Sequence, residues 1–255
     1  MIGADDRGFT LGDGLFETVL AEAGVLRHLD AHLDRMIAGC AVLGLPAPER
    51  GEAGRLMMTA LMDAGLTDVR AAVRLTLSAG PGGRGLERPA ALSPTLVATA
   101  ALAPAPSTPA RLVTAAVRRN ERSPASRLKT LSYLDNVLAR AEALAAGGDE
   151  ALMLNTRGEV ACAAAANLFW VAQGQLITPA LDCGVLAGTA RARLQVAADR
   201  IGRPVREVRA WPRALAGAEG VFLTNALVGV RWVEALDGRP MARTGPAVDL
   251  VASLL

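Results

Sequence analysis

The sequence predicts an α/β (α+β) protein of two domains, because helical and strand-like patterns follow each other along its 255 residues. With 51% hydrophobic residues the chain can bury a sizeable core. Its one proline-rich stretch, Ala103–Pro109, is stiff and extended, as a linker between domains would be. We therefore expect a small N-terminal α/β domain over residues 1–104, a linker over 105–110 and a larger C-terminal domain over 111–255.

The N-terminal part begins with strand-like residues 12–20 and a return strand at 24–29, which together predict a hairpin. Apolar residues at helical spacing then predict a helix that carries Arg35, a residue that by itself is typical of a solvated surface. A second helix at 49–64 follows, with strands at 69–78 and 96–101. The glycine-rich loop 80–85 holds Arg84 but lacks the Gly-Lys-Ser/Thr of a nucleotide-binding loop, so spacing alone leaves a substrate-contacting loop and a plain surface turn open.

The C-terminal part begins with a strand at 111–117 and a helix from Leu131 to Ala146. The predicted apolar face of this helix consists of Leu134, Leu138, Ala141, Leu144 and Ala145. Short strands follow at 150–154, 160–164, 167–171, 175–178, 221–226 and 230–234. Between them, the small-residue turn 184–191 leads into a helix that ends near Ile201. Such a turn offers backbone N–H groups to an anion, although many helices begin this way without binding one.

Lys129 is the single lysine among 27 basic residues, so the chain has kept one amine while arginine serves elsewhere as the surface cation. Arginine stays protonated and cannot form the imine that a lysine amine forms with a carbonyl. Lys129 lies just before a predicted helix, in a connection where reactive groups are often found. We hypothesise that Lys129 does covalent chemistry. The alternative is a surface lysine left over in an arginine-biased composition.

Charge and cysteine content argue against several function classes. The 27 basic and 25 acidic residues nearly balance and the arginines are scattered, so we expect a small-molecule substrate and no nucleic-acid partner. No apolar run approaches the ~18 residues of a membrane helix, so no membrane partner is expected. Residues 1–14 do not resemble a secretory leader, which predicts a cytoplasmic protein. Three widely spaced cysteines, and a His28–His32 pair without a third ligand, predict neither disulfides nor a metal site.

Seven short motifs occur in one order over about nine tenths of the chain. They are Asp6–Phe9 with Gly12–Thr18, His32–Arg35, Gly82–Gly85, Lys129–Tyr133, Ala166–Trp170, Gly184–Arg191 and Thr224–Leu227. This series resembles the fold-type IV pyridoxal-phosphate enzymes, which include the branched-chain and D-amino-acid transaminases and aminodeoxychorismate lyase. The resemblance implies a small α/β domain followed by a larger, cofactor-binding domain with a mixed, barrel-like sheet and helices.

The resemblance implies that Lys129 is the catalytic residue and binds pyridoxal 5'-phosphate through an imine. It places Arg35 on the cofactor phosphate, beside donors from two further segments. Those donors come from Gly188, Thr189 and Ala190 at a helix start and from Thr224, Asn225 and Ala226 at a strand end. The resemblance also implies that Tyr133 lies near the ring hydroxyl of the cofactor, and Arg84 is expected to contact a substrate carboxylate.

One departure from the family pattern bears on the reaction. Cys162 occupies the cofactor-binding position where most members have the glutamate that protonates the pyridine nitrogen, and Glu159 would point to the opposite face of a strand. A thiol holds the ring proton less well than a carboxylate, which makes the ring a weaker electron sink. Transamination depends on that electron sink more than a cleavage reaction does when the cleavage makes an aromatic ring, because the aromatic product supplies a driving force of its own. The chain therefore resembles most closely 4-amino-4-deoxychorismate lyase, which expels pyruvate and gives 4-aminobenzoate for folate synthesis.

Two alternatives stay open. A branched-chain or D-amino-acid aminotransferase has the same fold. A pyridoxal-phosphate protein that binds without turnover is suggested by the missing glutamate, although the retained Lys129 argues against it. Because family members are usually dimers with sites near the subunit interface, the resemblance also implies a homodimer.

Overall fold

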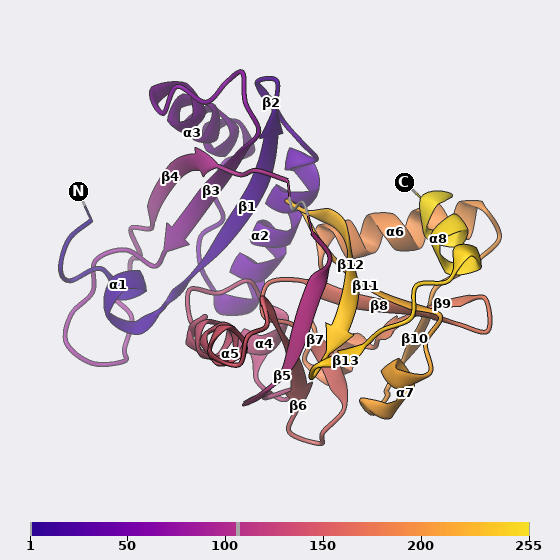
Figure 1. The fold of residues 1–255 in the computed structure, drawn as a ribbon. Coiled ribbons are helices and arrows are strands. Elements are labelled where there is room, and N and C mark those ends of the chain that lie inside the picture. The colour runs from indigo at the N-terminus through magenta and orange to yellow at the C-terminus, as the bar shows by residue number, and fades with distance from the viewer. Residues whose placement is uncertain (1, 106–107, 255) are drawn as a thin grey trace. The chain divides into compact units, whose positions relative to one another are not determined.

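The computed structural model describes residues 2–105 and 108–254, which form two compact units (Figure 1). Unit 1 consists of Met1–Ala105 and Leu128–Ser132, and unit 2 of Pro106–Arg127 and Tyr133–Leu255. The predicted linker at 105–110 falls partly on residues 106 and 107, which lie outside the described residues, so it stays a prediction together with the domain boundaries. These boundaries differ from the two units at residues 128–132, which carry Lys129 and group with unit 1.

Unit 1 is a four-stranded antiparallel sheet of order β2-β1-β3-β4 that packs against two long helices (Figure 1). Every second residue of β3 is buried, because one face of the sheet packs against the helices. On that face Val73 lies in one apolar core with Met36 and Met57 of the two helices. The elements are α1 (Arg7–Leu11), β1 (Gly14–Glu22), β2 (Val25–Leu26), α2 (Leu29–Leu43), α3 (Arg50–Asp63), β3 (Ala71–Ser78) and β4 (Thr95–Leu102).

Unit 2 is built on a mixed sheet of order β10-β9-β8-β11-β12-β5-β6-β7, with β13 paired to β12. Three strand pairs contain register shifts, which bend the strands. The strands are β5 (Ala110–Arg119), β6 (Glu150–Asn155), β7 (Val160–Ala163), β8 (Asn167–Ala172), β9 (Gln175–Pro179), β10 (Arg206–Val208), β11 (Gly220–Asn225), β12 (Gly229–Leu236) and β13 (Arg239–Pro240). The helices are α4 (Pro124–Arg127), α5 (Leu134–Ala145), the 3₁₀ turn η1 (Leu181–Cys183), α6 (Thr189–Arg200), α7 (Arg213–Ala216) and α8 (Gly245–Ala252).

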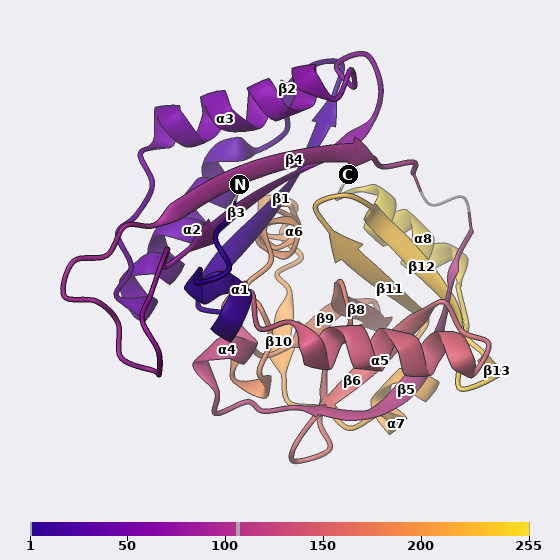
Figure 2. The same cartoon turned by 90° about the vertical axis from the view of Figure 1, so that its left-hand side faces the viewer.

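Helices cover the sheet of unit 2 and position two of the predicted site segments. Helix α5 packs on β5 and β6 (Figure 2). Helix α6 buries Leu194 against Phe222 of β11, whose ring stacks on Phe169 of β8 with ring centroids 5.3 Å apart. The starts and ends of these elements are therefore fixed by a packed core. The prediction of an α/β (α+β) fold with a larger mixed sheet is confirmed.

The predicted apolar face of α5 is wrong. Leu134, Leu138 and Leu144 are 66%, 47% and 57% exposed, and the face that packs on the sheet holds Ala139 and Ala143. Small side chains let the helix approach the strands closely, whereas the leucines point away from them. The helix also begins at Leu134 instead of residue 131, because residues 128–132 pair with β1. No helix in the described part of the chain has the length and apolar character of a membrane span.

Candidate active site

Lys129 is held beside strand β1 by backbone hydrogen bonds. The Phe16 N–H donates to the Lys129 carbonyl at 2.8 Å, and the Leu131 N–H donates to the Gly14 carbonyl at 2.9 Å. The Lys129 Nζ lies 4.1 Å from the centre of the Phe16 ring. A cation above an aromatic face is attracted to it, so the ring and the strand pairing together fix where the amine sits. This is the rigid setting that a covalent amine needs.

A second cation contacts the same ring. The Arg74 guanidinium lies 3.7 Å from the Phe16 ring centre, and its Nε donates to the Thr76 hydroxyl at 3.1 Å. Sequence reasoning did not connect Arg74 with Lys129. The signal that would have done so is the register of β1 and β3, which sets Phe16 opposite Thr76. Positive charge is therefore concentrated beside the lysine amine.

Arg35 on α2 pairs with a buried carboxylate. Its Nε and Nη2 donate to the two oxygens of Glu17 at 2.7 and 2.6 Å, and the His32 Nδ1 lies 2.7 Å from Glu17 Oε2. Burial alone would raise the pKa of Glu17, but the hydrogen bonds from His32 and Arg35 and the charge of Arg35 hold that pKa below its ordinary value. Arg35 is thus an oriented cation, and neither Glu17 nor His32 was singled out from the sequence as part of the site.

The hydroxyl of Thr130, next to Lys129, tests whether this half of the site fits a polar ligand. Thr130 is 5% exposed, and its Oγ1 has no hydrogen-bond partner among the described residues. A buried hydroxyl without a partner is costly, so the Thr130 hydroxyl is a place where a water or a polar ligand fits. Because Thr130 lies opposite Leu15, whose side chain joins the core between sheet and helices, the hydroxyl is on the same side of β1 as Glu17.

Arg84 lies exposed on its loop, with Gly85 at a φ of 101°. Two buried or half-buried arginines hold the residues after Arg84 against the rest of unit 1. Arg7 donates to the carbonyls of Leu86 and Glu87 at 2.9 and 3.1 Å. Arg88 bonds Asp13, and this hydrogen bond helps hold the pKa of Asp13 below its usual value against the opposing effect of burial. The role of Arg84 toward the substrate stays a prediction.

In unit 2 the start of α6 has the shape of an anion site. Gly188 precedes the helix, and Thr189 and Ala190 form its first turn, where backbone N–H groups have no helical acceptor. A Cβ on Gly188 would lie 2.0 Å from the Asn167 Oδ1, so a residue without a side chain is required there. The Asn167 Nδ2 in turn donates to the Leu186 carbonyl at 2.9 Å and braces the turn.

The end of β11 supplies the second backbone segment. Thr224 is 1% exposed. The Asn225 Oδ1 accepts from the N–H groups of Leu227 and Val228, both at 2.9 Å, and its Nδ2 donates to the Ala165 carbonyl. The Asn225 side chain therefore builds the turn that presents Ala226.

Cys162 on β7 is buried in an apolar cluster with its paired residue Met153. Burial raises the pKa of the Cys162 thiol, an effect that the charge of Arg119 opposes and that of Glu150 reinforces. The group is consequently a neutral thiol at neutral pH. No cluster of His, Cys, Asp and Glu in the described part of the chain has the arrangement of a metal site, and the prediction of no metal stays a prediction.

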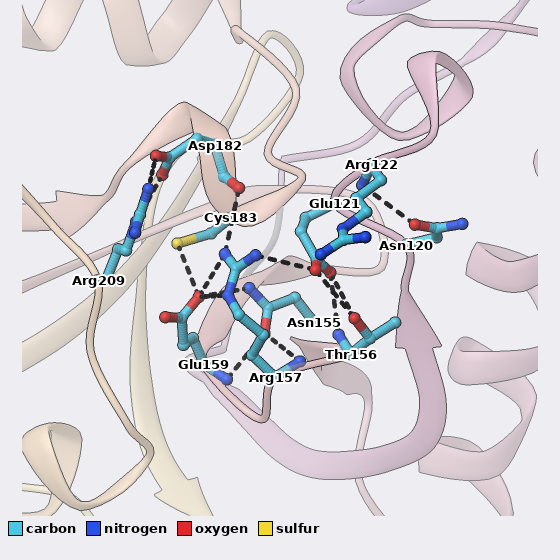
Figure 3. A network of polar contacts seen from close by, with 10 residues as sticks. All are labelled: Asn120, Glu121, Arg122, Asn155, Thr156, Arg157, Glu159, Asp182, Cys183 and Arg209. Carbon is cyan, nitrogen blue, oxygen red and sulfur yellow. Dashed lines mark hydrogen bonds and ion pairs between the residues drawn. The ribbon is translucent and has the colours of Figure 1, made fainter.

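Glu159 belongs to a separate polar network at one end of unit 2 (Figure 3). Arg157 donates to its Oε2 through Nε at 2.9 Å and Nη2 at 2.7 Å, and the Asn155 Nδ2 donates at 2.7 Å. The Cys183 Sγ lies 3.7 Å from the same oxygen. These bonds occupy the Glu159 carboxylate, so it is a poor replacement for the family glutamate.

Arg119 is a buried residue that sequence reasoning missed. It donates to the Asn136 Oδ1 at 3.0 Å, to the Gly184 carbonyl at 3.2 Å and to the Ser126 carbonyl. These acceptors belong to α5, to the turn before α6 and to α4, three residues ahead of Lys129. Arg119 therefore ties together the segments on which the predicted site of unit 2 depends.

The predicted site residues divide between the two units. Arg35, Arg84 and Lys129 belong to unit 1, and Tyr133, Cys162, Gly188, Thr189, Ala190, Thr224, Asn225 and Ala226 belong to unit 2. Unit 1 holds the Lys129 amine beside Phe16 and the guanidinium of Arg35 beside Glu17, and unit 2 holds two backbone segments and a neutral thiol. Tyr133 is the half-buried N-cap residue of α5. All of these assignments stay predictions.

Comparisons with known proteins give the same family. The family described as amino-transferase class IV matches residues 14–236. An aminodeoxychorismate lyase of Vibrio harveyi is 29% identical over 237 residues, which cover 91% of this chain and 86% of the relative. A D-alanine aminotransferase of Listeria monocytogenes is 28% identical over 258 residues, which cover 96% and 86%. The crystal structure of 4-amino-4-deoxychorismate lyase from Pseudomonas aeruginosa superposes with a TM-score of 0.88 at 34% identity, covering 100% of this chain and 94% of that one.

Proposed function

The chain belongs to the class IV aminotransferases, a family of pyridoxal-phosphate enzymes, and we propose that it is a 4-amino-4-deoxychorismate lyase, which releases pyruvate and 4-aminobenzoate. The observation that carries this choice is that Cys162, which the resemblance aligns with the family glutamate, is a buried neutral thiol. The similarity to the lyases of Vibrio harveyi and Pseudomonas aeruginosa supports it. The product would serve folate synthesis.

Bound pyridoxal phosphate supplies an electron sink for the electron pair released at the substrate carbon. In our proposal Arg35 and the backbone donors at Gly188–Ala190 and Thr224–Ala226 hold its phosphate, because a doubly charged anion needs both a guanidinium fork and N–H groups. Tyr133 would lie near the ring hydroxyl, and Arg84 would contact a substrate carboxylate. Lys129 would hold the cofactor through its amine, and with substrate bound that amine would remove the C4 proton and return a proton to the departing pyruvate.

The thiol of Cys162 favours elimination over transamination. A neutral group at this position holds a proton on the cofactor ring less well than a carboxylate does. Transamination moves a proton between two carbons and depends fully on charge withdrawal by the ring. Cleavage of aminodeoxychorismate makes an aromatic product, which supplies a driving force of its own, so this reaction tolerates the substitution better.

The test is incubation of the purified holoenzyme with 4-amino-4-deoxychorismate. We expect pyruvate and 4-aminobenzoate in equal amounts. Lys129→Ala should lower the rate by at least about 10⁴-fold, because it removes both the covalent anchor and the proton carrier, and should abolish the visible absorption band of the lysine-bound cofactor. Neither product from wild-type protein with an intact cofactor band would exclude the lyase.

An aminotransferase for branched-chain or D-amino acids is the second candidate, supported by the 28% identity to the Listeria monocytogenes D-alanine aminotransferase. It predicts that an amino-acid donor converts the bound cofactor to its amine form, a change visible in the absorption spectrum. If neither reaction occurs while the cofactor band persists, the protein is one that binds the cofactor without turnover.

We also propose a homodimer located in the cytoplasm. Three free, buried cysteines fit a reducing compartment. The exposed leucines of α5 form a stripe that a symmetric copy would cover. Leu138→Glu should convert the dimer to a monomer in light scattering, whereas Met62→Glu on α3, which changes a similarly exposed side chain, should leave it dimeric. A monomeric wild-type protein would contradict the proposal.

A further inference from the structure

Glu17 is a charged residue on the core face of β1. Its neighbours on that face, Leu15 and Val19, belong to the apolar core between the sheet and the helices, and the Glu17 side chain is 1% exposed. A carboxylate in such a place is costly unless donors surround it. The chain supplies two cation-capable side chains from one face of α2, Arg35 and His32, three positions apart.

The contacts to Glu17 fix the plane of the Arg35 guanidinium. Two parallel hydrogen bonds at 2.7 and 2.6 Å form a fork, a geometry in which neither group rotates freely. The bond between His32 and Glu17 Oε2 holds the carboxylate from a third direction, and the His32 side chain is itself 1% exposed. The Arg35 side chain remains 18% exposed, so the guanidinium is only partly enclosed by the protein.

We propose that Glu17 is a positioning residue for the cofactor: its carboxylate, braced by His32, holds Arg35 in the orientation that binds the phosphate of pyridoxal phosphate. The inference rests on the proposed assignment of Arg35 to that phosphate. A carboxylate that only neutralised Arg35 would compete with the phosphate for positive charge. Positioning and neutralisation therefore predict effects of opposite sign when the carboxylate is removed.

The experiment measures dissociation constants of the cofactor-free full chain for pyridoxal 5'-phosphate and for pyridoxal, which lacks the phosphate. Glu17→Gln keeps the shape but removes the charge. We expect it to weaken binding of the phosphorylated form about 10- to 100-fold, by analogy with the loss when the hydrogen-bonding partner of a metal ligand is removed, and to leave pyridoxal binding unchanged. Glu17→Gln in an Arg35→Met background should have no further effect, because the carboxylate acts through the arginine.

Glu22→Gln is the matched control. Glu22 lies on the same strand and accepts hydrogen bonds from Arg27 and Arg70, but its side chain is 39% exposed and it lies outside the proposed site. We expect unchanged binding of both compounds. Equal or tighter binding of pyridoxal 5'-phosphate by Glu17→Gln, beside an impaired Arg35→Met, would overturn the positioning role alone. Unimpaired binding by Arg35→Met would overturn the phosphate assignment and the positioning role with it.

Arg35→Lys keeps the proposal testable if Glu17→Gln does not fold. Lysine retains the charge but has no planar fork to pair with the carboxylate. If orientation is what matters, this variant loses as much affinity for the phosphorylated cofactor as Arg35→Met does. Wild-type affinity in Arg35→Lys would show that charge is sufficient and would overturn the proposal.

Discussion

Unit 1 and unit 2 each bury a titratable side chain in an apolar setting, and one of these groups is ionised whereas the other is neutral. Glu17 is surrounded by donors from Arg35 and His32, and its pKa lies below the ordinary value. Cys162 is packed in an apolar cluster, and burial holds its pKa above the ordinary value. Burial acts on both groups, and the direction of each pKa shift depends on whether hydrogen-bond donors accompany the group. At neutral pH both shifts keep the group in its ordinary state, an ionised carboxyl and a neutral thiol.

The difference matches the tasks that we propose for the two units. A carboxylate that orients a cation has to stay ionised, so unit 1 supplies a fork and a histidine. A group that leaves the cofactor ring uncharged has to stay neutral, and Cys162 is kept so although the buried Arg119 lowers its pKa somewhat. Variants at the two positions test whether this contrast is real.

Removal of the ionised Glu17 carboxylate should have the largest effect on the free energy of unfolding. Glu17→Ala leaves His32 and Arg35 without their buried partner, and we expect a loss of about 3 to 5 kcal/mol in the free energy of unfolding, as for other broken buried pairs. Urea denaturation measures it. Glu22→Ala, which removes an exposed carboxylate from the same strand, should cost less than about 1 kcal/mol. Equal losses of unfolding free energy in the two variants would show that the buried Glu17 carboxylate stabilises the chain no more than an exposed one.

Introduction of a carboxyl at the neutral position should have a smaller effect on stability and a visible one on chemistry. We expect Cys162→Glu to cost about 2 kcal/mol in stability, because it buries a polar group in an apolar cluster. We also expect it to raise the rate at which amino-acid donors convert the cofactor to its amine form by about tenfold, since a carboxylate retains the ring proton better. Cys162→Gln is the control for size, and an equal rise in that variant would exclude charge as the cause.

The order of helices and strands and the family were predicted correctly, because hydrophobic periodicity and short motifs can be read directly along the chain. The prediction of buried residues failed where packing between elements decides which face of a helix is covered. The leucines of α5 form a helical stripe, yet Ala139 and Ala143 face the sheet, because close approach of the helix favours small residues. Periodicity finds the stripe but cannot say whether the core of this chain or another surface covers it.

The candidate site shows the same limit. Lys129 stood out by its uniqueness, and Cys162 by its departure from the family pattern. Glu17 was passed over, although it interrupts the alternation of Leu15, Val19 and Ala21, and a charged residue in a core-facing series is a signal that sequence alone contains. Arg119 gave no such signal, since its acceptors lie on three separate segments that only the fold brings together.

The smallest expected effects are in the pH dependence of stability, where the two groups act at opposite ends. Glu17 has a lowered pKa, so its contribution is complete above the ordinary value of 4.5 and is lost as pH falls through its folded value. Cys162 has a raised pKa, so stability is complete below the ordinary value of 9.0 and falls as pH rises through the folded one. Each group changes the unfolding free energy by at most about 1.4 kcal/mol per pH unit.

Glu17→Gln should therefore flatten the acid limb of a plot of unfolding free energy against pH and leave the alkaline limb unchanged. Cys162→Ala should do the reverse. Cys183, whose pKa burial and nearby carboxylates raise to about 11, adds to the alkaline limb, so the comparison is made in a Cys183→Ala background. An alkaline limb that stays unchanged in Cys162→Ala would show that the thiol ionises as readily in the folded chain as in the unfolded one. It would thereby contradict a raised pKa of the Cys162 thiol, although a thiol with the ordinary pKa of 9.0 would still be neutral at neutral pH.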